Sequence, residues 1–239
     1  MQENLKGRLF LIPSPLGDNE PKEVIPEGVL GLLPKITTYV VEATRTARRY
    51  LSSAGLKGHI QDLEFHELNE HTSAKEVEAL LALFNDGRDV GLITEAGLPA
   101  VADPGSQLVR LCHRHGIEVV PMSGPSSLML ALMASGLNGQ SFAFLGYLPA
   151  KTDERRQALK SIEKHSSTAR QTKIFIETPY RNDSLLADIL SICQPSTELC
   201  IAADITMPDA FIRTRTVGEW KRDVPSIGKR PCVFLILAR

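Results

Sequence analysis

The chain has 239 residues, of which 43% are hydrophobic and 23% charged. These values are typical of a globular protein and exclude a fibrous or largely disordered chain, and the length suits one large domain or two modest ones. No apolar run reaches the roughly 18 residues of a membrane-spanning helix. The formal net charge of −1 argues against a broadly basic surface for nucleic acid, although it leaves room for a local basic patch.

In the first half of the chain, apolar and β-prone runs alternate with stretches of helical character. A capping box is expected where Ser73 and Glu76 open a helix. The pattern predicts strands at 8–12, 39–42, 90–94 and 118–120, and helices at 44–53, 74–85 and 106–115.

The alternation then restarts, with strands crowded toward the end of the chain. Helices are predicted at 126–135, 153–164 and 182–193, and strands at 142–145, 173–177, 198–203, 211–216 and 232–237. Strands that alternate with helices imply a parallel sheet covered on both faces. We therefore expect two α/β domains, 1–120 with a parallel sheet and 121–239 with a mixed sheet.

The four cysteines are scattered and form no CxxC pair, which argues against a zinc site and against a disulfide framework. The six histidines show no metal-binding spacing, so no metal is expected. A cytoplasmic location is the simplest expectation for such a chain.

Three loops at the predicted carboxyl ends of strands carry the candidate site, because open α/β sheets bind ligands there. The loop 13–19 holds two prolines and Gly17, and on its own it reads as an ordinary turn. In the loop 123–127, Ser126 and Ser127 stand where a helix begins. They favour either plain N-capping or contact with a ligand carboxylate.

The third loop, 94–105, is long for a connection from strand to helix. It lacks the GxGxxG pattern of a dinucleotide site and the lysine of a P-loop. Its backbone carbonyls and the carboxylates of Glu95 and Asp103 suit a cationic ligand that bears hydroxyl groups. S-adenosylmethionine (SAM), with a sulfonium, an ammonium and a ribose, is such a ligand.

Eight blocks follow one another in a recognisable order between Leu11 and Arg181: LIPSPLGD, VEATR, LNE, TEAGLPAVADPG, SGPSS, ASGLN, GYLPAK and ETPYR. Together they resemble the tetrapyrrole methylase superfamily, and within it most closely the ribosomal small-subunit methyltransferase I group. The resemblance implies a SAM-dependent enzyme that methylates a cytidine 2′-hydroxyl in 16S ribosomal RNA. It also implies a homodimer, with SAM folded into a cleft between the two domains.

The chain departs from the group in three places. Ala43 stands where the group has an aspartate, and the segment 202–207 lacks the group's arginine and lysine. The chain also ends at Arg239, without the group's usual C-terminal segment. Two alternatives therefore stand beside the ribosomal RNA methyltransferase: a methylase of a small, tetrapyrrole-like molecule, and a non-catalytic SAM-binding protein.

By position, the resemblance implies a SAM site with two walls and further contacts to the adenine and methionine portions. For Leu98 and Val101, packing in the core is as good an interpretation as contact with the ligand. The implied first wall is Pro13, Glu95, Ala96, Gly97, Leu98, Val101, Ala102 and Asp103, the second is Ser126 and Ser127, and the further contacts are Tyr180, Ala203 and Pro231.

Methyl transfer from a sulfonium needs mainly proximity and alignment, because its leaving group is already activated. A ribose hydroxyl is a weak nucleophile, so a nearby base or orienting group should help. For this role we select Glu42 and Arg45, which follow a strand, together with Asn69 and Glu70 of the LNE block. The alternative for Glu42 and Arg45 is a salt bridge at a solvated helix start.

A local basic patch is the last candidate feature. Lys151, Arg155 and Arg156 follow the GYLPAK block, and Arg181 closes the ETPYR block. Contact with RNA phosphates is the functional interpretation. For Arg155 and Arg156, an ordinary charged helix face is equally good.

Overall fold

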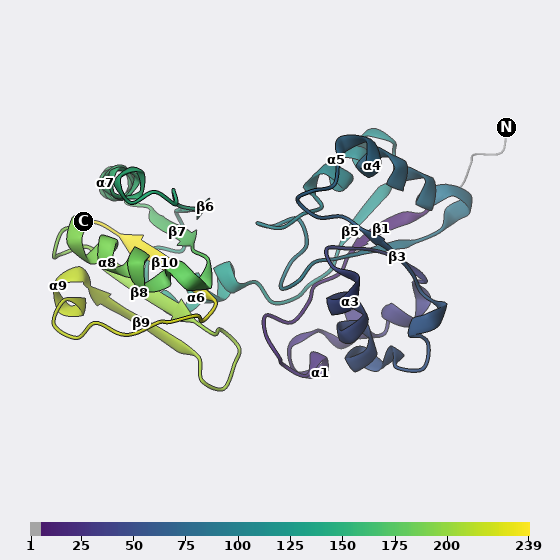
Figure 1. Cartoon of the computed structure of the whole chain (residues 1–239), viewed down its shortest axis with the longest axis horizontal. Helices are drawn as coiled ribbons and strands as arrows, with labels where there is room; N and C mark the ends of the chain where they lie inside the picture. The colour runs from purple at the N-terminus through teal and green to yellow at the C-terminus, as the bar shows by residue number, and fades with distance from the viewer. Residues whose placement is uncertain (1–5) are drawn as a thin grey trace. The chain divides into compact units, whose positions relative to one another are not determined.

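A computed structural model describes residues 6–239. Contacts between Cα atoms divide the chain into two compact units, Met1–Ser126 and Ser127–Arg239. Each unit contains one five-stranded sheet, and the sheets with their helices are drawn in Figure 1. Within residues 6–239, no helix combines the length and the apolar character required to cross a bilayer.

The first unit alternates strands with helices along most of its length. Its strands are β1 (Arg8–Leu11), β2 (Thr38–Val41), β3 (Glu64–Glu67), β4 (Val90–Ile93) and β5 (Glu118–Pro121). Its α-helices are α1 (Pro21–Val24), α2 (Glu27–Leu30), α3 (Thr44–Leu51), α4 (Ala74–Ala79) and α5 (Ser106–Arg114). A π-helix at Ser52–Leu56 and 3-10 helices at Leu33–Lys35, Ile60–Asp62 and Leu80–Gly87 complete it.

All strand pairs of the first sheet are parallel, in the order β3-β2-β4-β1-β5, which confirms the predicted sheet type. Neighbouring residues of one strand face opposite sides: Phe10 packs with α2 and α3, whereas Leu9 packs with α4 and α5. Figure 1 shows α1 and α3 on one side of this sheet and α4 and α5 on the other. Burial on both sides explains why β2 and β4, two of the three inner strands, are fully buried.

The sequence patterns missed β3 and made one helix too long. β3 is an edge strand of sequence EFHE, with two exposed and two half-buried residues, so it carries no apolar run. The helix predicted at 74–85 remains α-helical only to Ala79 and continues as a 3-10 helix. Its predicted capping box is confirmed, with Ser73 and Glu76 bonding each other's backbone N–H groups.

The second unit contains a mixed sheet, as predicted, in the order β6-β7-β10-β8-β9. β6 and β7 are parallel, and the other pairs are antiparallel. Its strands are β6 (Phe142–Tyr147), β7 (Thr172–Ile176), β8 (Glu198–Ala203), β9 (Phe211–Thr216) and β10 (Cys232–Leu237). Its helices are α6 (Ser127–Ser135), α7 (Thr152–Ala169), α8 (Asn182–Ile192) and α9 (Val217–Trp220), with a 3-10 helix at Pro179–Arg181.

One core cluster fills the second unit between the sheet and the helices α7, α8 and α9. Phe175 and Phe234 stack in it with their ring centroids 6.0 Å apart. α6 contacts β8, β9 and β10, and its own buried residues lie outside that cluster. The hydroxyl of Thr214 in β9 donates to the Ser135 carbonyl at the end of α6, which places α6 against the opposite face of the sheet.

Candidate functional site

The candidate site lies at the carboxyl edge of the first sheet, where five parallel strands end together. β2 and β4 are neighbours, and the chain leaves them for α3 and α5, which pack on opposite faces. This divergence is the place where open α/β sheets form a crevice for ligands. All three loops singled out from the sequence follow β1, β4 and β5 at this edge.

Backbone hydrogen bonds tie the first loop to the long loop. Ser14 N donates to the Gly97 carbonyl at 2.9 Å, and Gly97 N donates back to the Ser14 carbonyl at 3.1 Å. The Ser14 hydroxyl also donates to the Thr94 carbonyl, at 2.9 Å. Gly97 adopts a φ of +74°, a conformation that favours glycine. The two loops are therefore held as one piece.

The loop after β5 closes on the same place. A Cβ atom at Gly124 would lie 2.2 Å from the Cβ of Pro13, so only glycine permits this approach. Pro13 is held from its other side, because its carbonyl accepts a hydrogen bond of 2.9 Å from the Tyr50 hydroxyl in α3. All three loops thus pack around Pro13 and Ser14, which are both buried.

The long loop contains backbone strain of the kind found at ligand sites. Ala100 and Ala102 both adopt left-handed conformations, with φ of +64° and +62°. Such a conformation costs a non-glycine residue about 1–2 kcal/mol, so it persists only where surrounding contacts impose it. The strained residues lie between Gly97 and Gly105, the segment that carries most of the implied first wall.

Carboxylates cluster at the ends of β2 and β4. Glu42 Oε2 accepts a hydrogen bond of 3.1 Å from Glu95 N. Burial raises the pKa of Glu42, and the charges of Glu95 and Glu70 add to the rise. Burial, followed by the charge of Glu42, raises the pKa of Asp103 to about 6. Asp103 is thus poised to change its charge near neutral pH.

Thr94, at the start of the long loop, is buried. Its Oγ1 makes no hydrogen bond of good geometry with any residue in the range 6–239, although it lies near enough to Asp103 to lower that group's pKa. A buried hydroxyl without a partner is unfavourable by about 1–3 kcal/mol. A ligand atom that hydrogen-bonds to it would remove this penalty.

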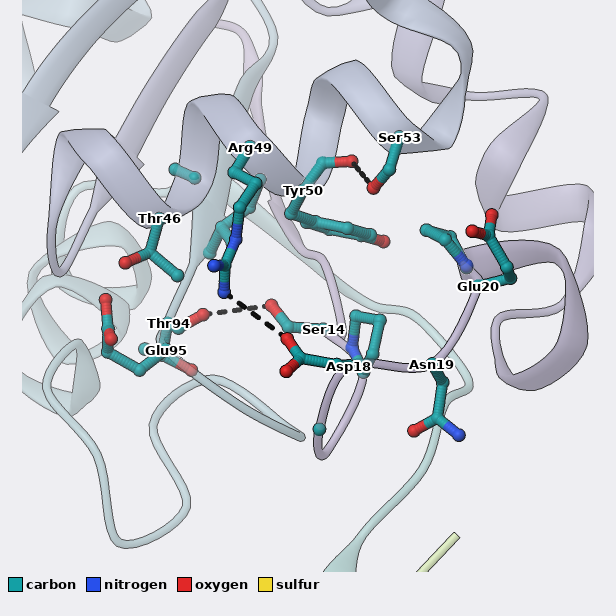
Figure 2. Close-up of a pocket in the computed structure, with 15 residues that line it drawn as sticks. Ser14, Asp18, Asn19, Glu20, Thr46, Arg49, Tyr50, Ser53, Thr94 and Glu95 are labelled. Carbon is teal, nitrogen blue, oxygen red and sulfur yellow. Dashed lines mark hydrogen bonds and ion pairs between the residues drawn. The ribbon is translucent and has the colours of Figure 1, made fainter. Parts of the chain in front are cut away.

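Beside this edge, a cavity of about 230 Å³ opens between α3 and the segment 14–21. Figure 2 shows Arg49 reaching from α3 to Asp18 across it, a contact of 3.6 Å. Tyr50 and Ile93 give it apolar walls, and its polar groups come from both sides. The cavity is lined by Ser14, Pro15, Gly17, Asp18, Asn19, Glu20, Pro21, Thr46, Ala47, Arg49, Tyr50, Ser53, Ile93, Thr94 and Glu95.

The structure brings part of the expected acceptor group together. Glu42 meets Glu95 as described, and it forms no ion pair with Arg45 among the described residues, so the alternative salt bridge is wrong. Arg45 is exposed on the first turn of α3. Asn69 shapes a turn, since its Oδ1 accepts from His71 N at 3.0 Å, and Glu70 is exposed next to it.

Among the expected SAM residues, the first wall is gathered at the sheet edge. Val101 is 46% exposed, so its interpretation as a core residue is wrong. Leu98 is half-buried, and Glu95, Ala96 and Ala102 are exposed. Ser126 and Ser127 join the two units.

Three expected SAM residues belong to the second unit. Ala203 is buried at the end of β8, next to Pro231, whose carbonyl accepts from Asp204 N at 3.0 Å. Tyr180 is 80% exposed. Lys229 Nζ lies 5.0 Å from the centroid of the Tyr180 ring.

The predicted basic patch after the GYLPAK block is wrong for Arg155, whereas Lys151 and Arg156 are exposed and pair with Glu154 and Asp188. Arg155 is only 2% exposed, and its guanidinium binds Asp188 of α8 at 2.5 Å. Arg156 binds the other oxygen of Asp188, and Arg181 binds Glu177 at 2.6 Å. These arginines form ion pairs within their own unit, with Asp188 far along the chain and with Glu177 four positions before Arg181.

Sequence reasoning also missed the cavity. Asp18 ends the LIPSPLGD block, whereas Arg49 lies outside all eight blocks, and no local pattern pairs a loop aspartate with a helix arginine. A signal for Thr94 was present, because it stands between a fully buried strand and a loop rich in glycine and proline.

Comparison with known proteins places the chain in a family. The family model of tetrapyrrole (corrin/porphyrin) methylases matches residues 31–221. The Ribosomal RNA small subunit methyltransferase I of Escherichia coli O157:H7 is 32% identical over 237 residues, which cover 98% of this chain and 79% of that protein. The protein of the same name from Thermotoga maritima is 35% identical over 200 residues, 84% of each chain.

Solved structures share the fold. The methyltransferase CobJ matches with a TM-score of 0.63 at 18% identity, over 97% of this chain and 94% of that chain. The uroporphyrin-III C-methyltransferase of Thermus thermophilus, complexed with S-adenosylhomocysteine, matches with a TM-score of 0.58 at 18% identity over 97% of each chain. The family match confirms the resemblance carried by the eight ordered motifs, and with it the expected enzyme class, a SAM-dependent methyltransferase. The chain therefore belongs to the tetrapyrrole (corrin/porphyrin) methylase family.

Proposed function

We propose that this protein transfers the methyl group of SAM to a ribose 2′-hydroxyl of small-subunit ribosomal RNA. The relatives from Escherichia coli and Thermotoga maritima are both named as methyltransferases of that RNA. The observation that carries the proposal is the sheet edge at which three loops lock around Pro13 and Ser14 beside a cluster of carboxylates. We infer that the protein acts in the cytoplasm, where this RNA is made.

The residues of this edge fit SAM. Thr94 Oγ1 is buried and has no hydrogen bond of good geometry among the described residues, so a ligand hydroxyl or ammonium group would satisfy it. The carboxylates of Glu95 and Asp103 favour a cationic ligand, which would also relieve their mutual repulsion. When bound, SAM would supply a methyl group carried on its sulfonium. Transfer of that methyl group leaves a neutral thioether. Pro13, Gly97, Leu98, Val101 and the residues beside them would hold SAM.

The acceptor side of the proposal centres on Glu42 and the neighbouring cavity. Glu42 is fixed by the Glu95 N–H group, and its raised pKa makes it a better proton acceptor than an ordinary glutamate. We assign to Glu42 the role of orienting the attacking hydroxyl and receiving its proton. The cavity between α3 and the segment 14–21 would receive a further part of the acceptor nucleotide, with the Tyr50 side as a flat wall.

The test is methyl transfer from labelled SAM to RNA and to small ribosomal subunits from a strain that lacks this gene. The expected result is one labelled site in 16S ribosomal RNA, resistant to alkaline cleavage as a 2′-O-methyl group is. Glu42→Gln should retain SAM binding and lose most of the transfer. Labelling of no RNA or subunit, with SAM binding intact, would reject the acceptor but keep the donor.

A second candidate is a methylase of a small heterocyclic molecule. The lining of the cavity favours it, because Asp18, Glu20 and Glu95 outnumber Arg49 and give the lining a net negative charge that repels phosphates. Labelled product in the small-molecule fraction of a cell extract, with no labelled RNA, would select this candidate.

We also propose that the protein forms a homodimer. Large apolar side chains are exposed on the side of the second sheet that carries α6, among them Met133 at 77%. An exposed apolar patch marks an interaction surface. Met133→Glu should convert the protein to monomers in sedimentation experiments, and Lys160→Glu on α7 is the control. The exposed residues of this side are Met129, Met133, Phe142, Tyr147 and Ile212.

A further inference from the structure

The positive charge of the second unit is concentrated in one short segment. The second unit has 15 Lys and Arg against 11 Asp and Glu, whereas the first has 12 against 17. Residues 211–230 contain six of these cations and only two acids. This segment therefore accounts for the whole positive excess of the second unit. We call five of these cations the β9 surface: Arg213, Lys221, Arg222 and Lys229, which are exposed, and Arg215, which is half-buried.

Aromatic rings hold three cations of the β9 surface in place. The Arg213 guanidinium lies 5.5 Å from the centroid of the Phe211 ring, and that of Arg215 lies 4.9 Å from the Trp220 ring. Lys229 lies over Tyr180 in the same way. Side chains fixed in this manner lose less conformational entropy when they bind a partner.

Contacts connect Arg213, Arg215 and Lys229 into one strip. Phe211 and Trp220 are in contact, with ring centroids 6.3 Å apart, so Arg213 and Arg215 lie over neighbouring rings. Arg230, next to Lys229, donates to the Asp209 carbonyl at 2.5 Å just before β9 begins. The strip thus follows the edge strand β9 and continues past its start.

Most of these charges are not neutralised. Arg213, Lys221, Arg222 and Lys229 have no carboxylate within ion-pair distance among residues 6–239, whereas Arg215 pairs with Asp223 at 2.9 Å. Arg155, Arg156 and Arg181 all have such partners. The β9 surface therefore offers four cations to an external anion. Among the described residues of this unit, the exposed Lys160, Lys164 and Arg170 also lack such a partner, but they are spread along α7 and its C-terminal end.

Charges on an edge strand also prevent sheets from joining edge to edge. That role explains Arg213 and Arg215, which lie on β9, but not Lys221, Arg222 and Lys229, which lie beyond it. A membrane surface is a poorer match than RNA, because α9 has only four residues and offers no amphipathic helix to insert.

We propose that the β9 surface binds the phosphate backbone of the acceptor RNA. The inference rests on the proposed function, since it requires an RNA acceptor. Cations that track a strand give affinity without reading the base sequence. The acidic first unit repels phosphates, so the second unit would supply most of the attraction that holds the RNA.

The experiment compares two variants that lose the same charge. One carries Arg213→Gln, Lys221→Gln, Arg222→Gln and Lys229→Gln, and the control carries Lys22→Gln, Lys57→Gln, Lys75→Gln and Arg114→Gln in the first unit. All eight residues are exposed. Binding of a 16S ribosomal RNA fragment is measured by fluorescence anisotropy from 50 to 200 mM salt, with the Kd of SAM and the kcat and KM for RNA measured in parallel.

We expect the β9 variant to bind RNA at least tenfold more weakly, with a higher KM for RNA and an unchanged Kd for SAM. Each phosphate contact contributes roughly 0.7 to the slope of log K against log salt for a single strand, so the slope should fall by about 2 to 3. The control variant should stay within twofold of the wild type.

Equal slopes and affinities for the two variants would overturn the inference, provided that the wild type methylates RNA. If the wild type binds and methylates no RNA, the proposed function fails, and the inference fails with it. Loss of binding to vesicles of phosphatidylglycerol, with RNA binding unchanged, would also overturn it.

Discussion

The two units of this protein share an architecture and differ in charge and in strand direction. The first has an all-parallel sheet and an excess of acidic residues, and the second has a mixed sheet and an excess of basic ones. A parallel sheet collects its loops at one edge, where Glu42, Glu95 and Asp103 meet. A mixed sheet scatters its loops, and its edge strand β9 displays cations instead. Under the proposed function, the first unit would carry out the chemistry and the second would hold the RNA.

The largest expected loss of stability comes from a buried ion pair of the second unit. Asp188→Ala removes the carboxylate that binds both Arg155 and Arg156. It leaves the buried Arg155 guanidinium with neutral acceptors only, the Ala150 carbonyl and the Ser184 hydroxyl. Loss of one partner of a buried pair should lower the free energy of unfolding by about 3–5 kcal/mol. Urea denaturation measures the change.

The matched control is the more exposed pair Arg215–Asp223, whose side chains are 28% and 75% exposed. Asp223→Ala should lower the free energy of unfolding by less than about 1 kcal/mol, because surface ion pairs contribute little. Equal effects of the two variants would mean that Arg155 finds another partner.

The chemical role of the first unit is tested at Glu42. Glu42→Gln keeps the shape and can still accept the hydrogen bond from Glu95 N, but it cannot take a proton. We expect kcat to fall by about 100-fold while the Kd of SAM changes little, since general bases contribute about this much. Single-turnover kinetics at saturating RNA measures the rate. A drop confined to KM would instead make Glu42 a binding residue.

Gly124→Ala tests the close packing of the three loops around Pro13. The added methyl group would overlap Pro13 and force the loops apart. Overpacking of this kind lowers the free energy of unfolding by about 1–3 kcal/mol, and SAM binding should weaken with it. Gly139→Ala, where a Cβ meets no atom within 4 Å, is the control. Calorimetry gives both quantities, and normal SAM affinity in Gly124→Ala would separate loop closure from binding.

The smallest predicted effect concerns pH. Asp103 has a pKa of about 6, so it is mostly protonated at pH 5 and mostly ionised at pH 7. A cationic ligand favours the ionised form, so the Kd of SAM should fall about tenfold as pH rises from 5 to 7. Asp103→Asn should remove this dependence and bind weakly at both values, whereas Glu27→Gln on α2 should not alter it. A pH dependence that survives Asp103→Asn would assign the titration to another group.

Local patterns predicted those parts of the molecule that depend on nearby residues. The strands 198–203, 211–216 and 232–237 match residue for residue, because each apolar or β-prone run is bounded by turn residues. The sequence pattern did not predict β3, because an exposed edge strand needs no apolar run. The role of Arg155 was misjudged because its partner Asp188 lies 33 positions away. The cavity was missed for the same reason, since its walls come from separate segments.

The paired hydrogen bonds between Ser14 and Gly97 have a further consequence for how ligands influence each other. The loop 13–19 borders the cavity, and the loop 94–105 carries most of the implied SAM wall. A ligand that orders either loop also orders the other, so the protein loses less conformational entropy when a second ligand binds. Donor and acceptor should therefore strengthen each other's binding by the same factor, as linkage requires. The hydrogen bonds between Ser14 and Gly97 would therefore couple the occupancy of the SAM site to that of the cavity.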